Sequence, residues 1–213
     1  MRTTGSTGTR HSTRHCHTLR EYSQKNEPIM KDILERAYAG EPISADDPKF
    51  ETLTKALEEA RHITAELNLT YHSPEEVRQI VRKLGVDIDD TATIRPPFYA
   101  DFGKSLHIGA RAFVNQLCCF MSRGNITIEE DVKIGPHVNL ITLNHGTDPA
   151  ERRIITSKPI HIKRNAWLGA AVTVMPGVTI GENSIVGAGA IVMHDVPDNV
   201  IVAGVPARVI KKL

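Results

Sequence analysis

An aliphatic residue recurs at every sixth position through the C-terminal half of the chain. The uninterrupted series is Ile162, Leu168, Val174, Ile180, Val186 and Val192. Earlier members of the same series are Ile128, Ile134 and Leu140. Six residues make one short strand and one corner, so three such units close a triangular coil with the aliphatic side chains inside. A coil of this kind buries its inner face only against the next coil. The pattern therefore predicts an all-β solenoid over residues 86–213.

Amphipathic helices are expected before the repeats, in a small helical segment over residues 29–85. The first would cover residues 30–39, and the second would cover residues 48–68 with its apolar residues along one face. The third has the strongest end signals, with Ser73 as the N-cap and Gly85 just after the last turn. Its apolar stripe needs a partner, so we expect this helix to pack against the solenoid.

The six-residue repeat is interrupted over residues 144–159. This segment is too long and too polar to form a corner of the coil, so we expect a loop that leaves the solenoid. Loops on a rigid scaffold often carry function, and His145 lies at the start of this one. An imidazole with a pKa of about 6.5 suits a general base at neutral pH, which makes His145 a candidate catalytic residue.

The composition is that of an ordinary globular protein, with 40% hydrophobic and 24% charged residues. A formal net charge of +1 gives no reason to expect a nucleic acid or a membrane as partner. Residues 1–28 are rich in Ser, Thr, Arg and His, which predicts a disordered basic tail. Three cysteines, two of them adjacent, make a poor disulfide framework, and this favours a cytoplasmic protein.

Several segments resemble the maltose/galactoside O-acetyltransferase family of hexapeptide-repeat acyltransferases. The matching segments are Pro96-Pro97-Phe98-Tyr99, Leu106-His107-Ile108-Gly109, Phe113-Val114-Asn115, Asn144-His145, Asn165-Ala166-Trp167-Leu168-Gly169 and Ala203-Gly204-Val205-Pro206-Ala207-Arg208-Val209-Ile210. The resemblance covers about residues 30–213 and implies a left-handed parallel β-helix, although right-handed crossovers are the general rule. It also implies a homotrimer with its sites between subunits, which uses acetyl-CoA to acetylate a hydroxyl of a sugar or glycoside.

The resemblance further implies roles for individual residues. His145 stands at the position of the family's general base, which would deprotonate the acceptor while the acceptor and acetyl-CoA are bound together. The residues expected to bind the acceptor are Asn115, Asp101 and Asp46. The residues expected to bind the donor are Trp167, Ala170, Ala188, Met193, His194, Arg208 and Lys211. The two cations in that set would pair with the phosphates of coenzyme A, and no metal is expected.

One departure from the family concerns the acceptor. The family has an acidic residue in the turn after the strand with the asparagine, whereas this chain has Ser122 and Arg123 there. An amino sugar, an amino acid or a negatively charged acceptor therefore stays open. A noncatalytic β-helix that serves as a scaffold is a further alternative. The zinc-dependent γ-class carbonic anhydrases share the fold, but they need a His-x₄-His pair that the repeats lack.

Overall fold

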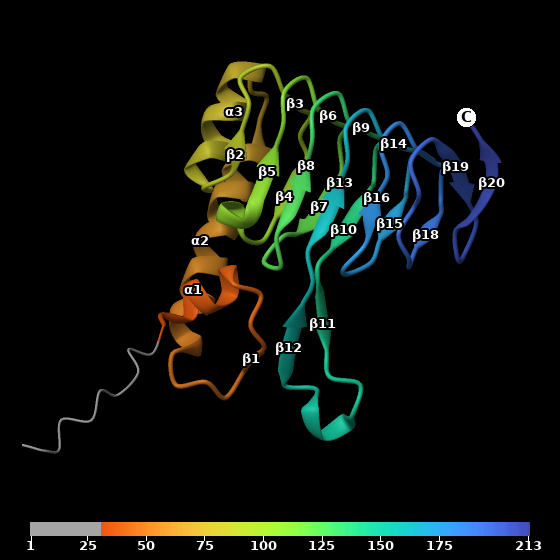
Figure 1. Cartoon of the computed structure of the whole chain (residues 1–213). Coiled ribbons are helices and arrows are strands. Elements are labelled where there is room, and N and C mark those ends of the chain that lie inside the picture. The colour runs from red at the N-terminus through yellow and green to blue at the C-terminus, as the bar shows by residue number, and fades with distance from the viewer. Residues whose placement is uncertain (1–30) are drawn as a thin grey trace, which may run out of the picture. The chain divides into compact units, whose positions relative to one another are not determined.

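The computed structural model describes residues 31–213, which form a parallel β-solenoid preceded by helices (Figure 1). The predicted disordered tail, residues 1–28, lies outside the described residues. The solenoid is a prism with three faces, and the chain completes about six coils. The all-β solenoid predicted from the six-residue repeat is confirmed.

Each face of the prism is a sheet whose strands come from successive coils. The first face consists of β2 (Asp87–Ile88), β5 (Leu106–Ile108), β8 (Ile126–Ile128), β13 (Ile160–Ile162) and β16 (Thr179–Ile180). The second consists of β3 (Thr93–Ile94), β6 (Phe113–Val114), β9 (Lys133–Ile134), β14 (Trp167–Leu168), β17 (Ile185–Val186), β19 (Val200–Ala203) and β20 (Arg208–Lys212). The third consists of β4 (Phe98–Ala100), β7 (Cys118–Met121), β10 (Asn139–Ile141), β15 (Thr173–Val174) and β18 (Ile191–Val192). All these strands pair in parallel except β20, which runs antiparallel to β19.

The aliphatic positions of the repeat form the core of the prism. Leu168 pairs with Ile134 in the coil before it and with Val186 in the coil after it. None of the three side chains is more than 1% exposed. Each coil therefore buries the same position against its neighbours, which is why the spacing is so regular.

The coils differ in length at one corner. Ile88 pairs with Ile108, a repeat of 20 residues, whereas Ile162 pairs with Ile180, a repeat of 18. From Ile88 the chain reaches the second face and then the third face at intervals of six residues. The two additional residues therefore lie at the corner where the chain passes from the third face back to the first. This third-to-first corner accepts insertions without disturbing the core.

The expected helices are α1 (Ile33–Tyr38), α2 (Phe50–Leu69) and α3 (Pro74–Lys83). Helix α3 begins with a capping box, in which the hydroxyl of Ser73 accepts the N–H of Glu76 at 3.3 Å and the Glu76 carboxylate accepts the N–H of Ser73 at 2.7 Å. Its apolar face is buried in the same core as the first coil, so α3 closes this end of the prism. Within residues 31–213, no helix is long and apolar enough to cross a membrane.

We expect Ser73→Ala to lower the free energy of unfolding by about 1 kcal/mol, because the substitution removes the N-cap hydroxyl of α3. Urea unfolding followed by circular dichroism measures this change. Ser73→Thr keeps a capping hydroxyl and serves as the control. Equal unfolding midpoints for the wild type and Ser73→Ala would contradict a stabilising cap.

The segment predicted as a loop over residues 144–159 is a β-hairpin. Its strands are β11 (Leu143–His145) and β12 (Ile154–Ser157), joined through the short 3₁₀ helix η2 (Pro149–Glu151). The hairpin leaves the prism at the third-to-first corner, as expected for an insertion (Figure 1). The segment leaves the prism as expected, but it forms strands because β11 pairs with β12. Strand β12 also pairs with β1 (Ile43–Ser44) of the helical segment, a partner that the repeat pattern does not contain.

Candidate active site

His145 lies on β11 with an exposed side chain. Its Nδ1 is 2.8 Å from the carbonyl oxygen of Arg152, across the hairpin. A carbonyl oxygen can only accept a hydrogen bond, so Nδ1 carries the proton and donates it. The other ring nitrogen, Nε2, then holds a lone pair. In the neutral form of the ring, Nε2 is therefore the nitrogen that can take up a proton.

One edge of the prism, where the second face passes into the third, carries five of the predicted binding residues. Parallel pairing aligns Val114, Ile134, Leu168, Val186 and Val202 through consecutive coils of the second face. The residues that follow these positions therefore stack along the edge. We call it the Trp167 edge. Its predicted members are Asn115, Ala170, Ala188 and Arg208, together with Trp167, which lies on β14 of the second face directly before the edge.

The members of the Trp167 edge form an extended row. Asn115 lies at one end, and Arg208 at the other end pairs with Ala203 of the last coil. Neighbouring parallel strands are about 4.8 Å apart, so the four steps from Asn115 to Ala203 cover about 19 Å. The alanines between these ends are exposed, and Trp167 is 51% exposed. The row therefore offers backbone, an indole face and a guanidinium to a long, thin ligand.

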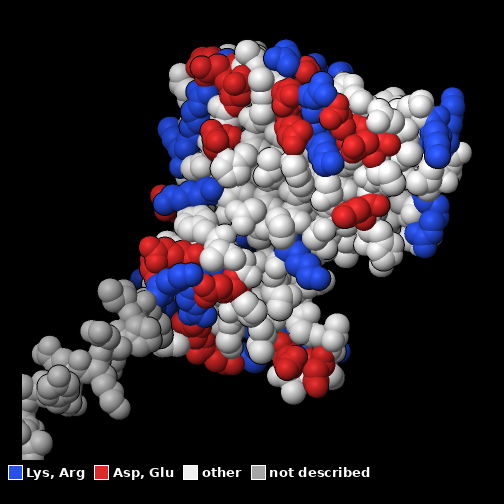
Figure 2. All heavy atoms as spheres, viewed as in Figure 1, with Lys and Arg blue, Asp and Glu red and all other residues white. Residues whose placement is uncertain are grey.

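The other predicted donor residues lie elsewhere on the prism. Met193 and His194 are exposed at the third-to-first corner, directly after β18. Lys211 lies on β20 and pairs with Ile201, at the opposite end of β19 from Arg208. Figure 2 shows Lys and Arg side chains at the end of the prism that β20 forms. The structure thus brings Arg208 to the Trp167 edge and leaves the remaining three at other positions.

His145 and the Trp167 edge do not meet within one chain. The hairpin leaves from the third-to-first corner, whereas the Trp167 edge joins the second and third faces. In Figure 1, β11 and β12 extend away from the prism, while β14 and β20 stay within it. The candidate base and the candidate binding row therefore belong to different parts of the subunit.

Comparisons with known proteins agree with this architecture. A family model described as bacterial transferase hexapeptide (six repeats) matches residues 159–194. The galactoside O-acetyltransferase of Lactococcus lactis subsp. lactis is 36% identical over 170 residues, which cover 78% of this chain and 82% of that protein. The chain belongs to the maltose/galactoside O-acetyltransferase family.

Solved structures of acetyltransferases match the chain over most of its length. A maltose O-acetyltransferase from Clostridium difficile 630 is 32% identical with a TM-score of 0.78, covering 86% of this chain and 98% of that one. A hexapeptide-repeat acetyltransferase from Vibrio cholerae in complex with acetyl coenzyme A is 32% identical with a TM-score of 0.76, covering 86% of this chain and 99% of that one. The chain is therefore an acetyltransferase, as its motifs indicated.

Asp101, expected to contact the acceptor, is held by Ser122, one of the two residues in the turn where the family is expected to carry an acid. Ser122 donates its N–H to Oδ1 of Asp101 at 2.6 Å, and its hydroxyl lies 3.3 Å from the same oxygen. Ser122 is fully buried and Arg123 is 4% exposed. Burial raises the pKa of the Asp101 carboxyl, against the opposing hydrogen bond from Ser122. In this acetyltransferase, Ser122 therefore holds a buried carboxyl in place.

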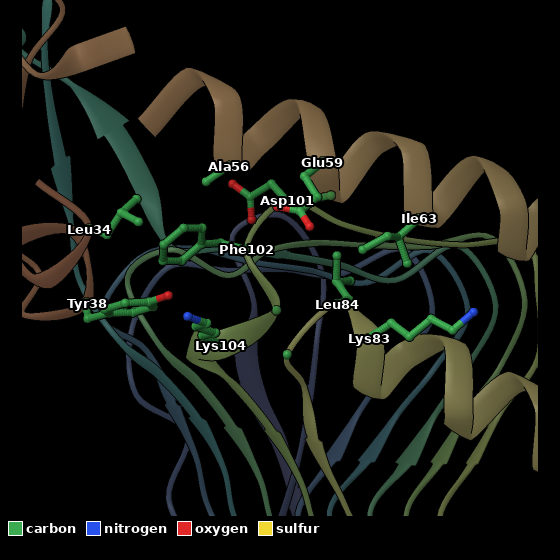
Figure 3. A pocket seen from close by; sticks show the side chains of 13 residues that line it. Leu34, Tyr38, Ala56, Glu59, Ile63, Lys83, Leu84, Asp101, Phe102 and Lys104 are labelled. Atoms are coloured by element: carbon green, nitrogen blue, oxygen red, sulfur yellow. The ribbon is translucent and has the colours of Figure 1, made fainter. Parts of the chain in front are cut away.

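The Asp101 carboxyl lines a cavity of about 260 Å³ beneath α2. In Figure 3 it lies beside Ala56 and Glu59 of that helix, with Tyr38 and Lys104 across the cavity. The structure thus places Asp101 under the helical segment, whereas Asn115 lies on the Trp167 edge. Asp101 and Asn115, two of the three predicted acceptor residues, are therefore not brought together within one chain.

Asp46, also expected to contact the acceptor, binds Arg153 of the hairpin through both carboxylate oxygens. The hydrogen bonds from Arg153 lower the pKa of Asp46. Arg153 carries no signal in the sequence that marks it as a site residue, and neither does Arg152, whose carbonyl oxygen binds His145. The β-branched residues Ile154, Ile155 and Thr156 of β12 favour a strand, but its pairing partner β1 is only two residues long and carries no such signal.

No group of three or more His, Cys, Asp or Glu side chains within residues 31–213 is placed to hold a metal ion. The two described cysteines have no disulfide partner. Burial raises the pKa of the Cys118 thiol to about 11, so this sulfur is protonated at neutral pH and is a poor nucleophile.

Proposed function

We propose that this acetyltransferase moves an acetyl group from acetyl-CoA to a hydroxyl of a sugar or glycoside, with His145 as the general base. The observation that carries the proposal is the bond from Nδ1 of His145 to the Arg152 carbonyl, which leaves Nε2 available as a base. The relatives named for galactosides and maltose support the acceptor class, and the Vibrio cholerae complex supports the donor.

The transfer takes place directly between two bound substrates. Nε2 removes the proton of the acceptor hydroxyl as the hydroxyl oxygen attacks the carbonyl carbon of the thioester. The tetrahedral intermediate collapses with cleavage of the carbon–sulfur bond, and the leaving thiolate takes the proton from the imidazolium. The products are the acetyl ester and free coenzyme A, and the imidazole is neutral again. No cysteine carries the acetyl group in this scheme.

Acetyl-CoA would lie along the Trp167 edge. Small exposed side chains at Ala170 and Ala188 let the pantetheine arm approach the backbone, and Trp167 offers an apolar surface beside it. Arg208 would pair with a phosphate at the far end of the row. Asn115 at the near end, with its partly exposed amide, would hydrogen-bond an acceptor hydroxyl.

We also propose a homotrimer in which each site forms between two subunits. Within one chain the hairpin points away from the Trp167 edge, so a neighbouring copy is needed to bring a His145 side chain to the row. A closed ring of three copies places each hairpin against the next subunit. Met193, His194 and Lys211 would then complete the donor site across the same interface.

The experiment that tests this function measures thiol release from acetyl-CoA with a panel of acceptors. The panel contains galactosides, maltose, amino sugars, serine and an acidic sugar, because Ser122 and Arg123 replace the family's acid. Turnover with neutral sugars supports the proposal. Turnover restricted to amino compounds would reassign the acceptor, and failure to bind acetyl-CoA in calorimetry would favour the scaffold alternative.

A further inference from the structure

The hairpin that carries His145 is held on one side by the helical segment. Strand β12 lies between β11 and β1 in a three-stranded antiparallel sheet outside the prism. Ile155 is the shared residue, because it pairs with His145 on β11 and with Ile43 on β1. The position of the candidate base therefore depends on a contact between segments that are more than 100 residues apart in sequence.

An ion pair extends this contact beyond the strands. Nε of Arg153 is 2.9 Å from Oδ2 and 3.1 Å from Oδ1 of Asp46, and Nη2 is 2.5 Å from Oδ1. The backbone adds a further bond, because the N–H of Ala45 donates to the carbonyl oxygen of Arg153 at 2.9 Å. Arg153 is thus held at both its side chain and its backbone by consecutive residues of the helical segment.

The loop that supplies Asp46 is itself anchored. The next residue, Asp47, accepts a hydrogen bond from the guanidinium of Arg36 on α1 at 2.6 Å and another from the N–H of Lys49 at 2.9 Å. The two adjacent aspartates therefore point to different partners, one toward α1 and one toward the hairpin. This arrangement connects the body of the helical segment to Arg153.

Arg153 directly follows Arg152, whose carbonyl oxygen binds Nδ1 of His145. We propose that the Asp46–Arg153 pair is a positioning device, which holds the Arg152 carbonyl where it selects the Nδ1–H tautomer of His145. Asp46 accordingly acts on the base through the hairpin and not by contact with the acceptor. This inference rests on the proposed role of His145 in acetyl transfer.

The Asp46–Arg153 pair contributes little to the free energy of unfolding, because both side chains are about two-thirds exposed. Its effect is local, since the bidentate geometry restricts the orientation of one peptide carbonyl. Catalytic groups are sensitive to such restriction, and a small misplacement lowers the rate without lowering substrate binding. A positioning role therefore predicts a loss in kcat at nearly constant KM and Tm.

The test compares Asp46→Asn and Arg153→Gln with the wild type. We expect kcat for acetyl transfer to fall about tenfold in each variant. The KM for acetyl-CoA and the KM for the acceptor should each change less than about twofold. The matched control is Asp131→Asn, because Asp131 forms an exposed bidentate pair with Arg111 on the prism, at 2.7 and 2.6 Å. A raised acceptor KM at unchanged kcat in Asp46→Asn would overturn the inference in favour of direct acceptor contact.

A measurement without turnover separates this inference from the proposed function. Nitrogen-15 NMR of histidine side chains at about pH 8 reports the neutral tautomer, and His145→Ala identifies the relevant signal. We expect the Nδ1–H form in the wild type and in Asp131→Asn, and a mixture of tautomers in Asp46→Asn. An unchanged tautomer in Asp46→Asn would overturn the positioning role. A wild type with the expected tautomer but without acetyl transfer would overturn the proposed function instead.

Discussion

We expect His145→Ala to lower kcat for acetyl transfer by about a thousandfold, with the KM for acetyl-CoA changed little. General base catalysis contributes roughly 10²–10⁴ to a rate, and the described hairpin places no second histidine beside His145. Binding of acetyl-CoA depends on the Trp167 edge, which lies on another part of the chain. Steady-state kinetics with an acceptor from the panel measures the effect.

Two other histidines serve as comparisons for this variant. His107 lies on the first face beside Asp87, so His107→Ala is the control for loss of an exposed imidazole. His137 is exposed at the corner between Asn115 and Ala170, on the same edge as the proposed donor site. Near-native turnover in His145→Ala together with a large loss in His137→Ala would show that the base is His137 of the prism and not His145 of the hairpin.

The second large effect is expected from mixing two inactive variants. His145→Ala lacks the base, and Ala188→Trp places an indole where the pantetheine arm is proposed to lie. Each variant alone is expected to retain only a small fraction of the turnover, but a mixed trimer contains one site with the base of one subunit and the intact edge of the next. With random assembly from equal amounts, each site is intact with a probability of about one half times one half. Coexpression should therefore restore about a quarter of the wild-type turnover.

The recovery of turnover requires that each active site contains residues of two subunits. If one chain supplied both the base and the donor edge, no mixed assembly would contain an intact site, and the coexpressed sample would stay as inactive as its parts. The two variants carry different affinity tags, so the mixed trimers are isolated before the assay. Each mixed trimer contains one intact site of three, so the isolated sample should reach about a third of the wild-type turnover. The control is the same mixture prepared from separately purified proteins without exchange of subunits.

The fold was largely predictable because its signals are local or strictly periodic. Each coil buries the same position, so aliphatic residues such as Leu168 and Val186 recur at a fixed spacing and identify the interior. The start of α3 was equally clear, because a capping box needs only Ser73 and Glu76, three residues apart. Neither inference required knowledge of distant partners.

The candidate site was predictable only in part. The interruption of the repeat marked the segment with His145, and the family resemblance supplied its expected role. The alignment of Asn115 with Gly169 and Gly187, which directly precede Ala170 and Ala188, follows from the register of the coils. That register was hidden, because successive coils repeat after 20, 18 or 16 residues.

The sequence by itself determined the solenoid, the helices before it and the identity of the candidate base. Only the tertiary structure decided how that base is held, because the deciding contacts join distant segments. Strand β1 pairs with β12, Asp46 binds Arg153 across 107 positions, and Arg152 turns its carbonyl to His145. Such contacts produce no regular spacing that could be recognised in the sequence. Each partner is a common polar or aliphatic residue, and only folding brings the two together.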